Sequence, residues 1–200
     1  MWRWVRCLSV FVLVIALAAC VVEPAAAPGV PPEAGVTEPA GGDRDDCPAP
    51  AEGQRLLIHD THGYCLLHPE EHTAEQVSEE ETVFYQGSIL NVQDPRLHVE
   101  VTDAAGQSAL AVAEAIREEA LAAVPDMDIS LEETTVDGGP AAVVDGLPGQ
   151  DINRRLVVVY DGRLYSLMFT PADAAHEGFE GMEALYALVT ESMRFVAPEG

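Results

Sequence analysis

Residues 154–170 read RRLVVVYDGRLYSLMFT, two apolar runs joined by Asp161-Gly162. An Asp-Gly pair between runs of β-branched and aromatic residues is the strongest short signal for a β-hairpin. Both runs are apolar at nearly every position rather than at alternate positions. We therefore expect two central strands of a sheet that is covered on both faces.

Further strands are predicted on both sides of this hairpin. Residues 96–101 alternate, with Leu97, Val99 and Val101 on one face, as in a strand buried on one side. Asp60-Thr61-His62-Gly63 is a turn signal between two short apolar runs, which predicts an N-terminal hairpin. The remaining predicted strands are residues 55–59, 64–68, 83–85, 129–136 and 141–145.

Two helices are predicted. Residues 108–124 place apolar side chains at helical spacing between a candidate N-cap, Ser108, and a helix-stopping Pro125. Residues 178–191 carry a second apolar stripe, and Met193 and Phe195 follow it as candidate core residues. The predicted fold class is α+β, an antiparallel β-sheet with helices packed on its faces.

Four short motifs occur along the chain in a recognisable order. They are Gly-Tyr-Cys-Leu-Leu-His-Pro at 63–69, Gly-Pro-Ala at 139–141, Tyr-Asp-Gly-Arg-Leu-Tyr at 160–165 and Glu-Ser-Met-Arg-Phe at 191–195. Their order resembles the PsbP-like family, the extrinsic photosystem II protein and its bacterial lipoprotein relatives, over residues 55–196. The resemblance implies an α/β/α sandwich and a non-enzymatic binding or assembly-assisting role.

Residues 1–20 have the parts of a lipoprotein signal peptide. Arg3 and Arg6 precede an apolar stretch that ends in Leu17-Ala18-Ala19-Cys20, a lipobox. The apolar run is shorter than the ~20 residues that span a bilayer. We expect cleavage before Cys20 and acylation of Cys20 with palmitate-type chains, which would place the protein on the extracytoplasmic side of a bacterial cell envelope.

The rest of the chain divides into a tether and a domain. Residues 21–53 are rich in Pro, Ala, Gly and Glu and have no apolar periodicity, which predicts a disordered tether. Residues 54–200 are predicted to form one globular domain, within the common size range.

The composition is strongly acidic. The chain has 34 Asp and Glu residues against 10 basic ones, all arginine, and a formal net charge of −24. Cleavage of the signal would remove Arg3 and Arg6 and no acidic residue. Such a surface repels phosphate backbones, so we expect no nucleic acid among its partners. The expected partners are the membrane, through the N-terminal lipid, and an envelope protein.

Cys47 and Cys65 are the cysteines that remain beside Cys20 after cleavage. An exported compartment permits disulfides, and a bridge between them would close a loop of about 18 residues. We expect this bridge; the alternative is two independent thiols, with Cys65 buried as a small apolar residue.

The histidines offer one candidate chemistry. His68, Glu71 and His72 match the H-x-x-E-H pattern of zinc peptidases, and His59 and His62 lie nearby. That mechanism needs both histidines on one helical face. Here the segment leaves a strand and has Pro69 at its second position. We therefore predict solvent-exposed turn histidines, with a metal site as the alternative.

No nucleophile elbow, calcium loop or phosphate cradle is present in the sequence. The predicted function is a lipid-anchored, extracytoplasmic accessory or binding lipoprotein without catalysis and without a cofactor. The alternative is a metal-dependent hydrolase that uses the cluster of His68, Glu71 and His72. A tethered domain with a purely structural role is a third interpretation.

Overall fold

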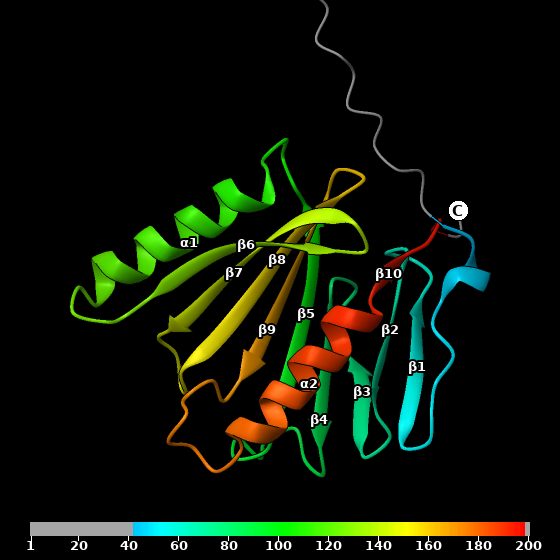
Figure 1. The fold of residues 1–200 in the computed structure, drawn as a ribbon, viewed down its shortest axis with the longest axis horizontal. Coiled ribbons are helices and arrows are strands. Elements are labelled where there is room, and N and C mark those ends of the chain that lie inside the picture. The colour runs from blue at the N-terminus through cyan, green and yellow to red at the C-terminus, as the bar shows by residue number, and fades with distance from the viewer. Residues whose placement is uncertain (1–41, 199–200) are drawn as a thin grey trace, which may run out of the picture. The chain divides into compact units, whose positions relative to one another are not determined.

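The structure is a computed structural model that describes residues 42–198, all within one compact unit. The signal peptide, Cys20 and residues 21–41 of the predicted tether lie outside the described residues. Figure 1 shows two helices and two antiparallel sheets in the described part of the chain. The helices are α1 (Ala109–Ala123) and α2 (Phe179–Ser192).

The larger sheet has seven strands in the order β3-β4-β5-β9-β8-β7-β6. Its strands are β3 (His72–Gln76), β4 (Glu81–Gln86), β5 (Arg96–Asp103), β6 (Ser130–Val136), β7 (Gly139–Leu147), β8 (Asn153–Tyr160) and β9 (Arg163–Thr170). The smaller sheet has the order β1-β2-β10. Its strands are β1 (Gln54–His59), β2 (Tyr64–Pro69) and β10 (Arg194–Phe195).

The predicted central hairpin is confirmed. β8 and β9 pair from Arg154↔Phe169 to Tyr160↔Arg163 around a two-residue turn. Asp161 and Gly162 have φ angles of 47° and 69°. Positive φ at both central residues is the geometry of a type I′ turn, whose twist matches that of the flanking strands. The two strands lie in the interior of the sheet, between β5 and β7.

The large sheet is covered on both faces. Leu156, Val158 and Leu167 are fully buried in a core that includes Met182, Leu185 and Val189 of α2. Val157 lies on the opposite face of β8 and is buried in a second core with Ala109 and Ala113 of α1. The helices therefore lie on opposite faces, which confirms the predicted α+β class as an α/β/α arrangement.

The N-terminal hairpin forms a sheet of its own, whereas the sequence predicts a single sheet. β2 pairs with β1 on one side and with β10 on the other. Tyr64 and Leu66 of β2 are buried in the same core as Phe84 and Leu97 of the large sheet. The small sheet thus packs against the face that α2 also covers, because α2 alone does not cover β4 and β5.

Helix α1 has the ends that the sequence predicts. The hydroxyl of Ser108 accepts a hydrogen bond from the backbone N–H of Ala111 at 3.2 Å, which caps the helix. Val124 ends it, immediately before Pro125. Met193 and Phe195, which follow α2, are buried as predicted.

Residues 42–53 are joined to the folded domain. The sequence places the end of the tether at residue 53, which is too far along the chain. The N–H of Gly42 donates to the carbonyl of Phe195 at 3.0 Å, and the N–H of Ala197 donates to the carbonyl of Gly42 at 3.1 Å. A 3-10 helix, η1 (Arg44–Asp46), and a disulfide between Cys47 and Cys65 follow. These contacts are backbone and covalent, so the apolar pattern of the sequence does not show them.

The disulfide predicted between Cys47 and Cys65 is confirmed, with a Cα–Cα distance of 6.0 Å. Cys65 is inaccessible to solvent within β2. The bond therefore fastens the N-terminal segment to the core of the small sheet.

Removal of this disulfide should lower the free energy of unfolding. We expect Cys47→Ser to cost about 3 kcal/mol, because the unfolded chain regains the entropy of an 18-residue loop. Urea unfolding of the variant and of the oxidised and reduced wild type measures this. Equal midpoints for the oxidised wild type and the variant would contradict it, and the oxidised wild type should contain no reactive thiol at Cys47 or Cys65.

Candidate functional site

The predicted histidine cluster separates into two pairs. His59 and His62 flank the β1–β2 turn, with their rings stacked 4.7 Å apart and the ring of Tyr64 stacked 5.1 Å from His59. Nε2 of His62 lies 2.6 Å from the carbonyl oxygen of Glu79, to which it donates. His62 thus joins the turn to the loop before β4, and both histidines of this pair are half-buried.

His68 and His72 form the second pair, and both are buried, with 4% and 5% of their surface exposed. The prediction of solvent-exposed turn histidines is therefore wrong for these two. The ring of His68 packs edge-on against Phe84 at 5.2 Å, and its Nδ1 lies 2.9 Å from the carbonyl oxygen of Pro69. His72 begins β3, a short strand that the sequence pattern does not predict.

The zinc-peptidase pattern lacks the helix that it requires. His68 lies in β2 and His72 in β3, strands of two different sheets. The two imidazoles are therefore not presented on one face of a helix, and the side chain of Glu71 is exposed. Within residues 42–198, no group of three or more His, Cys, Asp and Glu side chains is arranged to hold a metal ion.

The hydrogen bond of His72 determines which of its two ring nitrogens carries the proton. Nε2 lies 3.2 Å from the carbonyl oxygen of Pro95, and a carbonyl can only accept, so Nε2 carries the proton. Burial lowers the pKa of His72, while the neighbouring Glu71 and Asp94 act in the opposite direction with a smaller effect. The neutral ring leaves Nδ1 as an acceptor, and this buried atom has no hydrogen-bond partner among the described residues.

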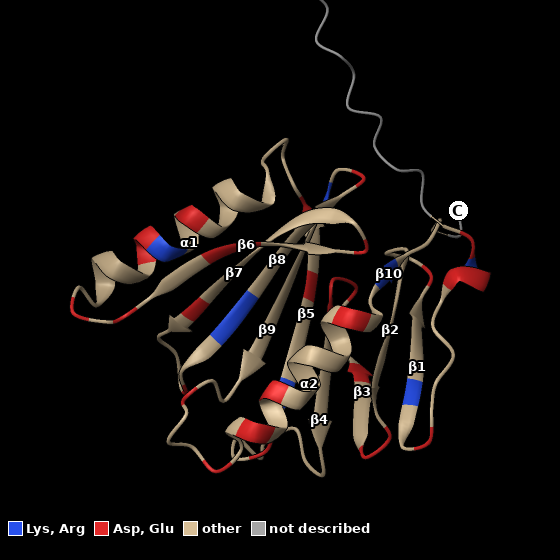
Figure 2. Ribbon diagram, in the orientation of Figure 1, with Lys and Arg blue, Asp and Glu red and all other residues tan. Residues whose placement is uncertain are grey.

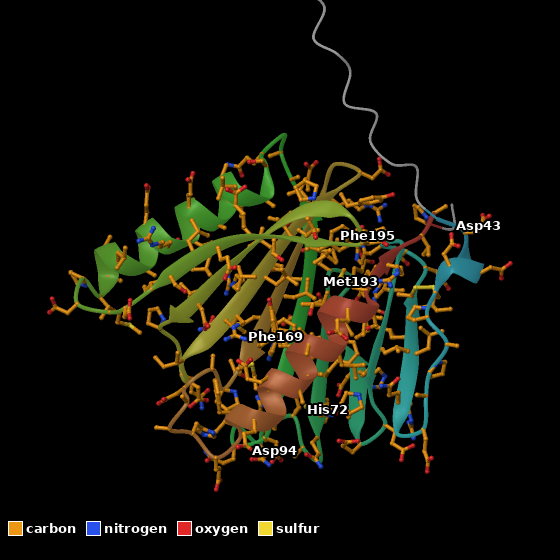
Figure 3. The ribbon with its side chains drawn as sticks, in the orientation of Figure 1. Asp43, His72, Asp94, Phe169, Met193 and Phe195 are labelled. Carbon is orange, nitrogen blue, oxygen red and sulfur yellow. A yellow bond between two sulfur atoms is a disulfide. The ribbon has the colours of Figure 1, made fainter. Side chains whose placement is uncertain are left out.

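His72 lies in the wall of a pocket of about 640 Å³ at the N-terminal end of α2, which we call the α2 pocket. In Figure 3, His72 and Asp94 lie toward the same end of the domain. Three carboxylates and three amides supply the polar part of the wall, and α2 and two prolines supply the apolar part. The polar residues are Glu71, Asp94, Glu177, Gln54, Gln86 and Gln93, and the others include Pro69, Pro95, Ala184, Leu185 and Leu188.

The sequence does not predict the α2 pocket, because its residues come from separate parts of the chain. Gln54 begins the first hairpin, Glu71 and His72 follow it, and Leu188 lies more than 100 residues later. The one available signal was His72 itself, which the sequence predicts to be a solvent-exposed turn histidine, with a metal ligand as the alternative. The structure retains His72 as a candidate site residue, in a pocket whose wall includes none of His59, His62 and His68.

A second polar pocket, of about 460 Å³, lies at the other end of β5, beside the β8–β9 turn. Its wall contains His62, Glu80, Asp103, Asp161 and Arg163. Arg163 donates to the carbonyl of Thr61 at 2.9 Å, and His62 donates to Glu79. The basic groups here already have partners, so the α2 pocket is the better candidate for a binding site.

The arrangement of these elements defines an α/β/α sandwich with an acidic pocket at one end of α2. Among solved structures, the chain is similar to the solution structure of cyanobacterial PsbP (CyanoP) from Synechocystis sp. PCC 6803. The TM-score is 0.51 at 15% sequence identity, over 73% of this chain and 94% of that one. The chain has a PsbP-like fold, as the order of its sequence motifs predicts.

A structure from Bacteroides thetaiotaomicron is also similar, with a TM-score of 0.37 and 10% identity. It matches over 70% of this chain and 48% of that one. No protein-family model and no curated protein matches the sequence. Among residues 42–198, neither helix has the length and apolar character needed to cross a membrane.

Acid should destabilise the domain in the range in which histidines titrate. In the folded state the pKa values of three histidines are lowered, and burial is the largest cause for each: His59, His68 and His72. The unfolded histidines have a pKa near 6.5, so below about pH 6.5 the unfolded state binds more protons, and stability is lost as the pH falls. We expect the unfolding free energy to decrease from about pH 7 to about pH 5, above the range of ordinary carboxylates.

Two measurements check this expectation. Urea unfolding at each pH should show a weaker pH dependence for His68→Gln/His72→Gln than for the wild type. A proton NMR titration should place the His72 midpoint below 6.5. A His72 midpoint at or above that value would contradict the argument.

Proposed function

We propose that this protein is a lipid-anchored, extracytoplasmic accessory lipoprotein that binds another component of the bacterial cell envelope and performs no chemistry. The observation that carries the proposal is the lipobox at residues 17–20, followed by a domain with a PsbP-like fold. The solved structure that the chain resembles is itself a cyanobacterial PsbP. Accessory binding is the role that this likeness favours.

The disulfide supports an exported location. Bonds of this kind persist in oxidising compartments and are rare in the cytosol. The bond between Cys47 and Cys65 lies 27 residues after Cys20 in the sequence, where an anchored chain enters its domain. It would hold that point of entry against the small sheet.

The position of the α2 pocket also fits an anchored binding domain. Gly42 lies beside Val196, and Phe195 pairs with Tyr64 at the start of β2. The α2 pocket includes Pro69, at the opposite end of the same strand. Gly42, the first described residue, and the α2 pocket therefore lie at opposite ends of β2.

The lining of the α2 pocket favours binding over catalysis. It contains no Ser, Thr, Cys, Lys or Arg, and its one histidine donates to a backbone carbonyl. The lining therefore offers no Ser, Thr, Cys or Lys nucleophile of the kind that a neighbouring base activates. The alternative of a metal hydrolase at His68, Glu71 and His72 gains no support, because these residues lie on strands and in a turn.

Acylation of Cys20 gives the direct test. Labelled palmitate should be incorporated into the wild type, and Cys20→Ala should abolish the label and move the protein from the membrane to the soluble fraction or leave it as an unprocessed precursor. The reason is that two or three acyl chains supply about 0.8 kcal/mol for each buried CH₂ group.

Cys7→Ala is the matched control, since Cys7 lies within the predicted signal and should leave both labelling and membrane retention unchanged. Labelling of the Cys20→Ala variant would contradict the anchor. A reproducible turnover that His72→Gln abolishes would contradict the non-catalytic role.

A further inference from the structure

The α2 pocket combines negative charge with a buried acceptor. Glu71, Asp94 and Glu177 contribute three carboxylates to its wall, and no arginine lines it. The N-terminus of α2 also faces it and carries roughly half a positive charge. Three full negative charges exceed this, so the pocket attracts cations.

The lining of the α2 pocket is not arranged as a site for a single metal ion. The described residues contain no cluster of three or more His, Cys, Asp and Glu side chains suited to a metal. A volume of about 640 Å³ is also far larger than an ion needs, and it lies in the size range of small-molecule sites. The carboxylates are distributed around a space that suits an extended organic molecule.

His72 adds a requirement for a hydrogen-bond donor. Its Nδ1 accepts, is inaccessible to solvent and has no partner in residues 42–198. An unpaired acceptor of this kind is costly, and an N–H group brought by a ligand would satisfy it. The exposed side chains of Glu71 and Gln86 line the same pocket and can change rotamer to admit such a group.

The apolar part of the wall defines the rest of the ligand. Ala184, Leu185 and Leu188 of α2 and the ring of Pro95 form a surface suited to an aliphatic chain. Metal ions and bare ammonium have no such chain. A cationic head with several N–H donors on a stem of a few methylene groups matches the carboxylates, the Nδ1 acceptor of His72 and the apolar wall.

We propose that the α2 pocket binds an organic cation, a guanidinium or alkylammonium group on an aliphatic stem, whose N–H groups pair with the pocket carboxylates and with Nδ1 of His72. The same chemistry occurs in a free small amine and in an arginine or lysine side chain of a partner protein. The inference deepens the proposed accessory role by naming what the domain recognises. It does not depend on the acyl anchor.

The binding test uses the full mature chain in non-ionic detergent at pH 7.5, titrated with agmatine by calorimetry. We expect one site per chain. Glu71→Gln/Glu177→Gln should lower the affinity by about tenfold or more, since charge-assisted hydrogen bonds are lost. Both side chains are exposed, so the variant should retain its fold.

Glu114→Gln/Glu118→Gln is the matched control. It removes the same charge from exposed positions of α1, on the other face of the large sheet, and should leave the affinity within about twofold of the wild type. An equal loss in both variants would overturn the proposal, because the binding would then be diffuse attraction. Displacement of agmatine by Mg²⁺ at the same ionic strength would overturn it as well.

His72→Gln tests the acceptor separately. The glutamine amide can still donate to the carbonyl of Pro95, as Nε2 of His72 does, but its own acceptor, Oε1, lies at a different position from Nδ1. We expect weaker agmatine binding with an unchanged circular dichroism spectrum. In the wild type, agmatine should shift the ¹⁵N resonance of His72 Nδ1; an unshifted resonance with full binding would exclude this contact.

Two further titrations distinguish the source of the cation. A capped Gly-Arg-Gly peptide that binds as tightly as agmatine indicates a partner side chain, and much tighter binding of agmatine indicates a free amine. Binding of neither ligand would overturn the proposal. That result leaves the palmitate experiment on Cys20 unaffected, and a negative palmitate result leaves the binding measured here unaffected.

Discussion

The burial of β8 and β9 on both faces is the constraint on which the rest of the structure depends. Successive side chains of a strand point to opposite faces, so a strand with Leu156, Val157 and Val158 in sequence must be covered twice. One cover is α1, and the other is α2 together with the small sheet. The sheet then extends from this hairpin through β5 and β4 to β3, the edge strand that contains His72.

The N-terminal segment is held by contacts of a different kind. Neither η1 nor the residues on either side of it bury a large apolar side chain. Gly42 is joined to the C-terminal strand by backbone hydrogen bonds, and Cys47 is joined covalently to a buried residue of β2. These bonds place Gly42 at one end of the small sheet, and the α2 pocket lies at the opposite end.

The carboxylates of this acidic chain are of two kinds: some pair with arginines inside the fold, and others line the α2 pocket. Figure 2 shows acidic residues over most of the described elements and arginines at few positions. Several arginines pair within the fold: Arg154 binds Asp145 at 2.6 Å and Glu183 at 2.7 Å, and its guanidinium lies 4.7 Å from the centre of the Tyr186 ring. The carboxylates of the α2 pocket have no arginine in the same wall. The local charge is therefore uncompensated at the one pocket that also holds a buried, unpartnered imidazole nitrogen.

The sequence alone determined the features that depend on neighbours in the chain. The Asp161-Gly162 turn, the cap at Ser108, the ends of both helices and the α+β class all follow from local patterns. The bond between Cys47 and Cys65 was predicted from the cysteine count and from the expected export of the chain. Only the tertiary structure decided which segments meet. β3 has no apolar pattern and exists because its backbone pairs with β4, and the small sheet exists because β10 returns to β2 from the far end of the chain. His72 became a buried acceptor for the same reason: Pro95, α2 and the β4 edge enclose it, and contacts between residues so distant in sequence leave no periodic signal.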